Sequence, residues 1–374
     1  MDFNLDEQEI MLQQAAKEFA TKSILPKAAD IDLGNYPKEI IKDLAELGYF
    51  GLPYPSQYGG SGGGYLSYFL VLEQICQASA AVGAIMSVNL TPAEAVLRFG
   101  NEEQKKRFIT PVSLGKALGC IAFTEAETGS DPREITTVAR KTDNSYIING
   151  HKQFVCNAPG AKLALVFAKQ ETGEGINAFI VDTSTPGFII QSTCDMMGLR
   201  GAGTSVVFLD DVTVPAENLL GDEGEGFGIL LEAISVERLW VGAQALGVAQ
   251  AALDIALSYA KQRKAMGKPI TKLLTIQWHL AEMATQIEAT RWLAYRAAFI
   301  RDQGHDIKYE SSMVKLFASQ AAVEVTRMGM QVTGAYGAMK SMPIERLYRD
   351  AKMTEIYVGI AEVQRAIIAN SLIR

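Results

Sequence analysis

A block of short β-rich runs separates two long helical stretches, and this order constrains the fold more strongly than any other feature of the sequence. Four predicted strands, each bounded by turn residues, cover residues 163–168, 176–181, 187–191 and 205–209. Short strands that follow one another without intervening helices favour an antiparallel barrel or sandwich over a doubly wound sheet. We therefore predict an α+β protein with an N-terminal helical domain (1–118), a middle antiparallel β-barrel (119–224) and a C-terminal four-helix bundle (225–374).

The dipeptide Asn149-Gly150 stands between two further β-rich runs, residues 145–148 and 152–155. Asn-Gly accepts the positive φ angles of a tight turn. The pattern predicts a β-hairpin whose turn is formed by these two residues.

Capping signals divide the N-terminal helical stretch. Residues 91–94, Thr-Pro-Ala-Glu, predict a helix start with Thr91 as the N-cap. Asn101 and Gln104 repeat the pattern at the next helix. A second hypothesis, that Asn89 and Thr91 line a pocket, stays open at this point.

Composition and charge narrow the class of protein. With 374 residues, 48% hydrophobic and 21% charged, the chain can form a folded protein with a sizeable core. The formal net charge is -7 and no basic block occurs, so we expect no nucleic-acid partner. Four widely spaced cysteines without a C-x-x-C pair are typical of a reducing compartment. An acidic N-terminus and the lack of an uninterrupted apolar run of membrane-spanning length predict a cytoplasmic protein with no membrane span.

Glu237 is the most informative residue of the long helical run 226–259. Its neighbours three and four residues away along the helix are all apolar: Ala233, Ile234, Trp240 and Val241. Burial in such a stripe disfavours the charged form and raises the pKa of a carboxyl group, which suits a proton acceptor. A structural ion pair explains the same placement, because buried carboxylates are rarely unpaired. The residues of this helix alone leave both interpretations open.

Hydrolase and metal chemistry have little support. The histidines His151, His279 and His305 lie far apart without metal-ligand spacing, and no G-x-S-x-G motif occurs, so we expect no metal site. The segment 123–131 is rich in hydroxyls and glycine. Its N–H groups and hydroxyls could hold a polar ring or a phosphate, although a plain loop would look the same.

A series of motifs, collinear along nearly the whole chain, resembles the acyl-CoA dehydrogenase flavoproteins. In the middle region the motifs are Thr124-Glu125, Gly129-Ser130-Asp131 and Asn149-Gly150-x-Lys152-x-Phe154-Val155-x-Asn157. Further along they are Gly198-Leu199-Arg200, Val214-Pro215-x-Glu217-Asn218, Gln244-Ala245-Leu246-Gly247, Arg263-x-x-x-Gly267-x-Pro269, Gln331-Val332-x-Gly334, Pro343-x-Glu345-Arg346 and Gln364-Arg365. The length of this series argues against chance.

The resemblance implies a homotetrameric enzyme that holds FAD between the barrel and the bundle and desaturates an acyl-CoA thioester. It also implies that an electron-transferring flavoprotein accepts the electrons. The residues that would surround the flavin are Phe123, Thr124, Gly129, Ser130, Phe154 and Cys156. An adjoining subunit would contact the rest of FAD through Arg263, Gln331 and Gly334. The substrate would lie against Ser130, Arg238, Val358 and Gly359, and its CoA portion would lie near Arg238.

The resemblance also identifies a base. Most family members carry the catalytic Glu in a Tyr-Glu-Gly-Thr motif near the C-terminus, but this chain has Val358 in that place. Valine cannot accept a proton. The isovaleryl-CoA and long-chain acyl-CoA dehydrogenases also lack Glu there and use one directly before an Arg on the long helix, which Glu237 and Arg238 match. Glu237 would therefore abstract the α-proton while flavin N5 accepts the β-hydride.

Three alternatives stay open. The chain could bind flavin or CoA without dehydrogenase turnover, it could catalyse an unusual elimination on a cyclic acyl-CoA with a base elsewhere, or it could act as an oxidase. We expect a branched, cyclic or medium-to-long acyl-CoA as substrate. Pocket depth selects among these acyl groups, and it depends on helix packing that sequence patterns do not specify.

Overall fold

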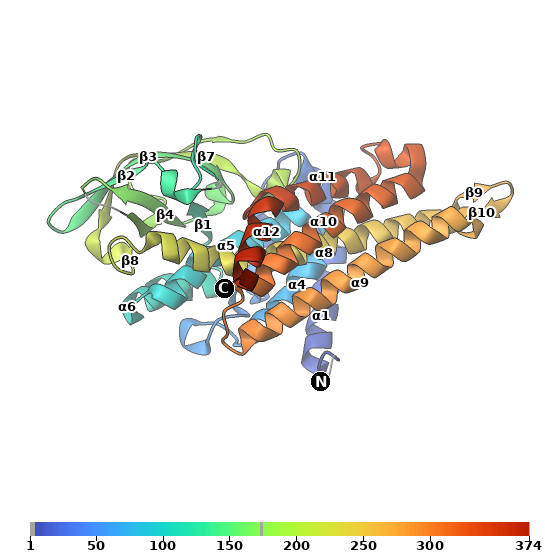
Figure 1. The fold of residues 1–374 in the computed structure, drawn as a ribbon, viewed down its shortest axis with the longest axis horizontal. Coiled ribbons are helices and arrows are strands. Elements are labelled where there is room, and N and C mark those ends of the chain that lie inside the picture. The colour runs from blue at the N-terminus through green and yellow to red at the C-terminus, as the bar shows by residue number, and fades with distance from the viewer. Residues whose placement is uncertain (1–3, 130, 173–174, 374) are drawn as a thin grey trace.

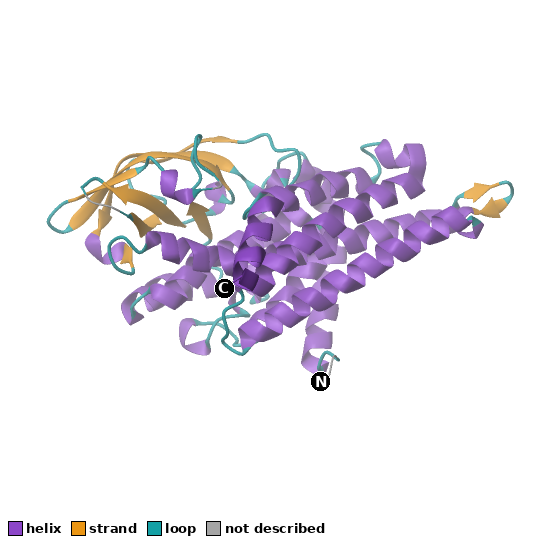
Figure 2. Ribbon diagram, viewed as in Figure 1, coloured by secondary structure: helices purple, strands orange, loops and turns teal. Residues whose placement is uncertain are grey.

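The computed structural model describes residues 4–129, 131–172 and 175–373. A sheet lies at one end of an elongated molecule, and long helices extend from it toward the other end (Figure 1, Figure 2). One helix, α5, contacts both the first strand of the sheet and the long helix α8 of the C-terminal region. It therefore joins the two parts of the protein.

The N-terminal region is helical, as predicted. Its helices are α1 (Glu7–Phe19), α2 (Ala28–Asp32), α3 (Lys38–Glu46), α4 (Gly64–Ala78), α5 (Ala80–Phe99), α6 (Glu102–Gln104) and α7 (Thr110–Ser113). Asn101 and Gln104 form the predicted capping box at the start of α6. The predicted helix start at Thr91 is wrong, because α5 begins earlier, behind its cap Ser79, and continues through Pro92.

The middle region forms one open, mixed sheet. Its strands are β1 (Gly119–Ala122), β2 (Val138–Lys141), β3 (Ser145–Val155), β4 (Leu163–Gln170), β5 (Ile176–Asp182), β6 (Phe188–Thr193), β7 (Ser205–Pro215) and β8 (Leu219–Leu220). The strand order is β6-β7-β3-β2-β4-β5-β8, and β1 also pairs with β4. The predicted closed antiparallel barrel is wrong, because β6 and β8 end this order without pairing to each other. In addition, β1 and β2 both run parallel to β4, one after the other along it.

The predicted hairpin turn at Asn149-Gly150 is also wrong, because β3 is one continuous strand. The pairing of β3 with β7 shifts register between Ile148 and Gly150. Asn149 donates from Nδ2 to the Asp211 carboxylate and accepts from the Asp211 N–H, both at 2.9 Å. A Cβ at position 150 would lie 2.2 Å from Thr137 Oγ1. The glycine therefore permits close packing at a bulge in the strand.

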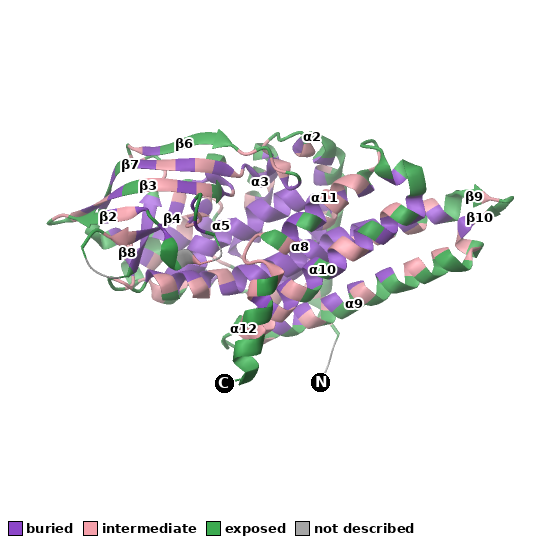
Figure 3. Ribbon diagram, turned by 45° about the horizontal axis from the view of Figure 1, so that its top comes forward, coloured by how far each residue is buried: buried purple, intermediate pink, exposed green. Residues whose placement is uncertain are grey.

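Helices make up most of the C-terminal region, as predicted. They are α8 (Gly226–Gln262), α9 (Leu274–Asp302), α10 (Lys308–Thr333), α11 (Pro343–Ile356) and α12 (Ala361–Ile373), and a small β9–β10 hairpin (Lys264–Ala265, Lys268–Pro269) follows α8. The central helix is α8, which contacts α4, α5, α9, α10 and α11. Its middle is buried, whereas α12 is largely exposed (Figure 3). The domain boundaries predicted at 118/119 and 224/225 fall between α7 and β1 and between β8 and α8, and they stay predictions.

Two described helices, α5 and α8, are long and apolar enough to cross a membrane by length and composition. A third candidate is α11 with α12, a pair bent by 44°. Neither α5 nor α8 is an uninterrupted apolar run, so the predicted absence of a membrane span stays a prediction. Within the protein, 94% of the apolar window of α5 and 67% of that of α8 are buried.

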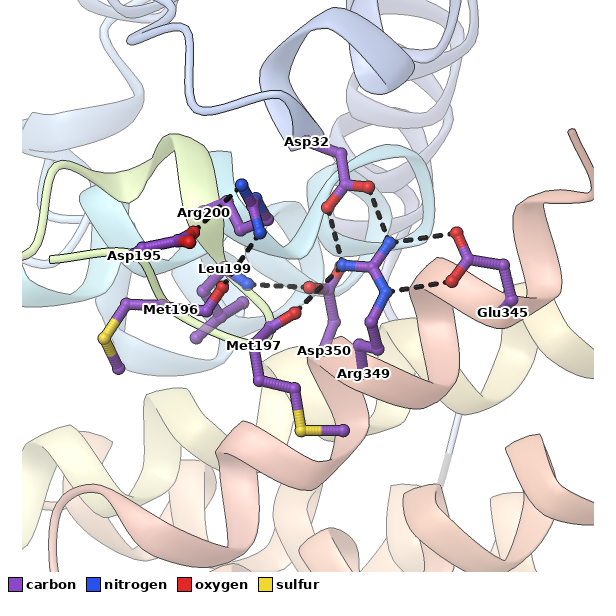
Figure 4. Close-up of polar contacts among 9 residues, drawn as sticks. All are labelled: Asp32, Asp195, Met196, Met197, Leu199, Arg200, Glu345, Arg349 and Asp350. Carbon is purple, nitrogen blue, oxygen red and sulfur yellow. Dashed lines mark hydrogen bonds and ion pairs between the residues drawn. The ribbon is translucent and has the colours of Figure 1, made fainter. Parts of the chain in front are cut away.

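The segment between β6 and β7 is tied to α2 and α11 through Arg349 (Figure 4). Arg349 donates from all five of its guanidinium N–H groups, at 2.6 to 3.0 Å. Two bonds go to the Asp32 carboxylate, two to the Glu345 carboxylate and one to the Met197 carbonyl. The next residue, Asp350, accepts from the Leu199 N–H at 2.7 Å. Because α11 leads into the 357–360 turn, this cluster fixes the position of that turn relative to the sheet.

We expect Arg349→Lys to lower the free energy of unfolding by about 2 kcal/mol in urea denaturation. A lysine ammonium donates from one point and cannot span two carboxylates and a carbonyl. The control is Arg327→Lys, whose ion pair with Glu324 is about half exposed. That change should cost less than about 0.5 kcal/mol, and equal losses in the two variants would contradict the prediction.

Candidate active site

Glu237 and Thr91 meet where α8 packs against α5. Both side chains are buried, with 4% and 1% of their surface exposed. The Thr91 hydroxyl donates a hydrogen bond to Oε2 of Glu237. Thr91 therefore does not cap a helix, and the hypothesis that Asn89 and Thr91 line a pocket stays a prediction.

The electrostatic setting of Glu237 is that of a carboxyl group removed from water. Burial raises its pKa to about 8. Among the described residues no cation lies within ion-pair distance of Glu237 or lowers this pKa, so the structural ion pair is not supported. A buried carboxyl group that titrates close to neutral pH has the properties of a general base.

Arg238 lies in the core beside Lys315 of α10 and is only 2% exposed. Its Nε and Nη1 atoms have no hydrogen-bond partner among the described residues, and burial lowers its pKa to about 10. The guanidinium therefore retains its charge at neutral pH. Its contact with the CoA portion of a substrate stays a prediction.

The ends of strands β1 and β3 lie side by side. Phe123 and Thr124 follow β1, and the Gln153 N–H near the end of β3 donates to the Thr124 carbonyl at 2.8 Å. Phe154 is 56% exposed, and its φ angle of 56° is left-handed. An exposed aromatic ring on a strained backbone suits contact with a planar ligand.

Cys156, one residue beyond β3, links this surface to the base. Burial and the nearby charge of Glu237 raise the pKa of the Cys156 thiol to about 12. The thiol is therefore neutral and close to the carboxylate, which places the base and the strand ends in one site. Gly129 is exposed in the loop after Thr124. The predicted site residue Ser130 lies outside the described residues.

A buried ion pair supports this loop. Lys152 Nζ lies 2.8 Å from Oε1 of Glu125 and 3.3 Å from the Phe123 carbonyl oxygen. Thr136 and Thr137 each donate to the Glu125 carboxylate from a backbone N–H and a hydroxyl. Burial raises the pKa of Glu125, but Lys152 and the two threonines outweigh it and lower this pKa to about 2. Glu125 and Lys152 belong to separate sequence motifs, and nothing in the residue order indicates that they form a pair.

Val358 and Gly359 form the turn between α11 and α12, with φ angles of 56° and 90°. A β-branched residue rarely adopts such a left-handed conformation. The Gln364 side chain holds the turn, because Nε2 donates to the carbonyls of Val358 and Gly359 at 3.2 and 3.0 Å. Sequence reasoning found Gln364 only as part of a motif and missed this function.

The second group of predicted cofactor residues lies elsewhere. Arg263 directly follows α8, and Gln331 and Gly334 lie at the end of α10. The rings of Tyr259 and Tyr336, 6.2 Å apart, bring these two helix ends together. This part of the bundle is opposite the sheet (Figure 1). Within one chain, these residues therefore do not meet Phe154 and the strand ends.

Comparisons with known proteins agree with this architecture. The family models for the N-terminal, middle and C-terminal domains of acyl-CoA dehydrogenase match residues 6–116, 120–212 and 224–373. The short-chain specific acyl-CoA dehydrogenase of Mus musculus mitochondria is 40% identical over 378 residues, which are 99% of this chain and 91% of the relative. Butyryl-CoA dehydrogenase from Megasphaera elsdenii superposes with a TM-score of 0.97, at 39% identity and full coverage of both chains. A chain in a structure described as the electron transferring flavoprotein of Acidaminococcus fermentans superposes with a TM-score of 0.98, at 38% identity and full coverage.

The chain therefore belongs to the acyl-CoA dehydrogenase family. This confirms the predicted activity, FAD-dependent dehydrogenation of an acyl-CoA thioester, an oxidation of a CH–CH bond.

The strand-end residues fit the isoalloxazine ring of FAD. Phe154 offers an uncovered aromatic surface, and Thr124 and Cys156 add a hydroxyl and a thiol beside it. An aromatic ring, a hydroxyl and a thiol can stack on and hydrogen-bond to a planar polar ring system, so the residues present fit this cofactor.

Proposed function

We propose that Glu237 is the base that removes the α-proton of a short-chain acyl-CoA thioester. The observation that carries this proposal is a buried carboxyl group that forms no ion pair with the described residues and lies beside the flavin-side residue Cys156. Its pKa of about 8 matches the task, because a base works best when its pKa is close to the working pH. Val358 occupies the usual position of the base and cannot perform this step.

The reaction requires a base and stabilisation of the enolate oxygen that develops as the α-proton leaves. Glu237 holds the proton on its carboxylate after abstraction. Burial and the charge of Glu237 raise the pKa of Tyr357, which leads into the left-handed turn that Gln364 fixes, and we infer that a backbone N–H of this turn serves the thioester oxygen. A preorganised N–H needs no rearrangement when negative charge develops on the thioester oxygen. Bound FAD supplies the acceptor for the hydride from the β-carbon.

Two hydrogen bonds of Gln244, in the interface between α5 and α8, support a short-chain acyl group as the substrate. Tyr357 donates from its hydroxyl to Oε1 of Gln244, and Gln244 donates from Nε2 to Ser87 Oγ at 3.0 Å. Gln244 lies seven residues beyond Glu237 on α8, about 10 Å along the axis. We infer that the hydrogen-bonded residues Tyr357, Gln244 and Ser87, two helical turns from the base, limit the length of the acyl chain. The relatives named for short-chain and butyryl substrates agree with this proposal.

We also propose a homotetramer in the cytoplasm that passes electrons to an electron-transferring flavoprotein. The separation of Arg263, Gln331 and Gly334 from the strand ends supports an assembly, since a neighbouring subunit can supply the second half of the FAD site. Four free cysteines agree with a reducing compartment. The likeness to a chain of the Acidaminococcus fermentans electron transferring flavoprotein structure supports the proposed acceptor.

A panel of acyl-CoA esters tests the substrate class. We expect anaerobic butyryl-CoA to bleach the flavin absorbance at least about tenfold faster than a twelve-carbon ester, because the polar contact at Gln244 excludes the longer chain. Mass spectrometry of the product should show the loss of two hydrogens. Faster bleaching by the long ester would contradict the short-chain proposal, and an elimination product without flavin bleaching would contradict dehydrogenation.

A further inference from the structure

Thr91 makes an unusual contact for a threonine inside a helix. Several helical threonines of this chain donate to the carbonyl four residues earlier, as Thr290, Thr326 and Thr333 do. Thr91 instead donates across the interface between α5 and α8, to Oε2 of Glu237. The other carboxylate oxygen, Oε1, takes no part in this bond.

The sheet fixes the position of Thr91. Pro92, the next residue, lacks an N–H and locally restricts the backbone of α5. Asn89 accepts a hydrogen bond from the Gly119 N–H of β1 through Oδ1, at 2.7 Å. A Cβ at Gly119 would lie 2.9 Å from the Asn89 carbonyl oxygen and 3.0 Å from Pro92 Cγ. This part of α5 is therefore seated directly on the strand that leads to Phe123 and the flavin-side loop.

The groups that face Glu237 from the other elements are neutral near pH 8. They are Tyr68 of α4, Cys156 after β3 and Tyr357 after α11. Burial and the charge of Glu237 are among the causes that raise the pKa of each. The hydroxyl of Thr91 is thus a neutral donor, and within the described part of the chain no cation forms an ion pair with the base.

Two further groups titrate in the next layer. Burial raises the pKa of Asp350, behind Tyr357, to about 6. Burial and then Arg238 lower the pKa of Lys315 to about 8. Arg238, next to the base on α8, stays charged. A titration of Glu237 must therefore distinguish its signal from the signals of Asp350 and Lys315.

We propose that Thr91 is a positioning residue for the base, which fixes the Glu237 carboxylate by holding Oε2 and directs Oε1 toward the α-proton of the substrate. This inference rests on the proposed function of Glu237. A donor on one oxygen also favours the ionised carboxylate, since a hydrogen bond to the charged form stabilises that form. Thr91 therefore both orients Glu237 and increases its ionised fraction at neutral pH.

The test compares Thr91→Val, Thr91→Ser and Thr326→Val in the FAD-loaded enzyme. Valine keeps the size of the side chain and removes the hydroxyl, and serine keeps the hydroxyl. Thr326→Val is the matched control, because Thr326 is also fully buried in a helix and bonds only to carbonyls of its own helix. Thermal unfolding of each variant shows that it is folded.

The first readout is an infrared pH titration without substrate. The band of the protonated carboxylic acid that disappears in Glu237→Gln belongs to Glu237. Thr91→Val should move the midpoint of this band upward by about one pH unit, and Thr91→Ser and Thr326→Val should leave it close to that of the unmodified enzyme. An unchanged midpoint in Thr91→Val would overturn the proposal.

The second readout is the rate of anaerobic flavin bleaching at saturating butyryl-CoA. At pH 7 we expect Thr91→Val to be about tenfold slower, with an unchanged Kd for the substrate, because fewer base groups are ionised. Equal rates at pH 7 would count against Thr91. Full bleaching by Glu237→Gln would instead reject the proposed base, so the two failures are distinguishable.

Discussion

Glu237→Gln should reduce the rate of anaerobic flavin bleaching by acyl-CoA by about 10³-fold, because the amide cannot accept the α-proton. The variant keeps the size of the side chain, so FAD should stay bound and the protein should stay yellow. In the unmodified enzyme the rate should rise as the pH passes about 8, where the carboxyl group loses its proton and becomes a base. Stopped-flow spectroscopy across this pH range measures both effects. Rapid bleaching of the variant would show that the base lies elsewhere.

The double variant Glu237→Gln with Val358→Glu provides a positive control for this prediction. It returns a carboxyl group to the position at which most family members carry the base. We expect the double variant to bleach the flavin at least about tenfold faster than Glu237→Gln, since the flavin-side residues are unchanged. A double variant no faster than Glu237→Gln, although folded and yellow, would show that the 357–360 turn has lost the geometry for this chemistry.

The second large effect is expected for Lys152→Met. It leaves the Glu125 carboxylate buried without a cation, although four donors from Thr136 and Thr137 remain. We expect a loss of about 3 kcal/mol in the free energy of unfolding, measured by urea denaturation at pH 7. Retention of FAD on gel filtration should also fall, since Lys152 holds the Phe123 carbonyl in the flavin-side loop.

Lys152→Met combined with Glu125→Gln separates charge from packing. Glutamine carries no charge, but its single amide oxygen can accept from only one of the two threonines, so the double variant should regain only part of the lost stability. The direction in which stability changes with pH follows from the lowered pKa of Glu125. The stability that it contributes is present above its ordinary pKa and is lost as the pH falls toward about 2. If the double variant loses as much free energy of unfolding as Lys152→Met alone, the explanation by charge is contradicted.

The candidate base could be predicted because its signals are local. The apolar neighbours of Glu237 on the helix and the valine at position 358 are visible in the residue order. Among the residues that the structure describes, Glu237 forms no ion pair, and this could not be seen without the groups packed around the carboxylate. In contrast, the partner of the base was interpreted as a helix cap, because Thr91 before Pro92 satisfies the local pattern of a helix start.

The sequence alone determined the helical, β and helical order of the chain and the chemistry available at Glu237 and Val358, since periodicity and residue type are local properties. Only the tertiary structure decided that the sheet is open and mixed, that Asn149-Gly150 forms a bulge and that Thr91 meets Glu237. These features depend on contacts between residues far apart in the chain. Their stability comes from packing and hydrogen bonding in the folded protein, and local propensity does not encode them.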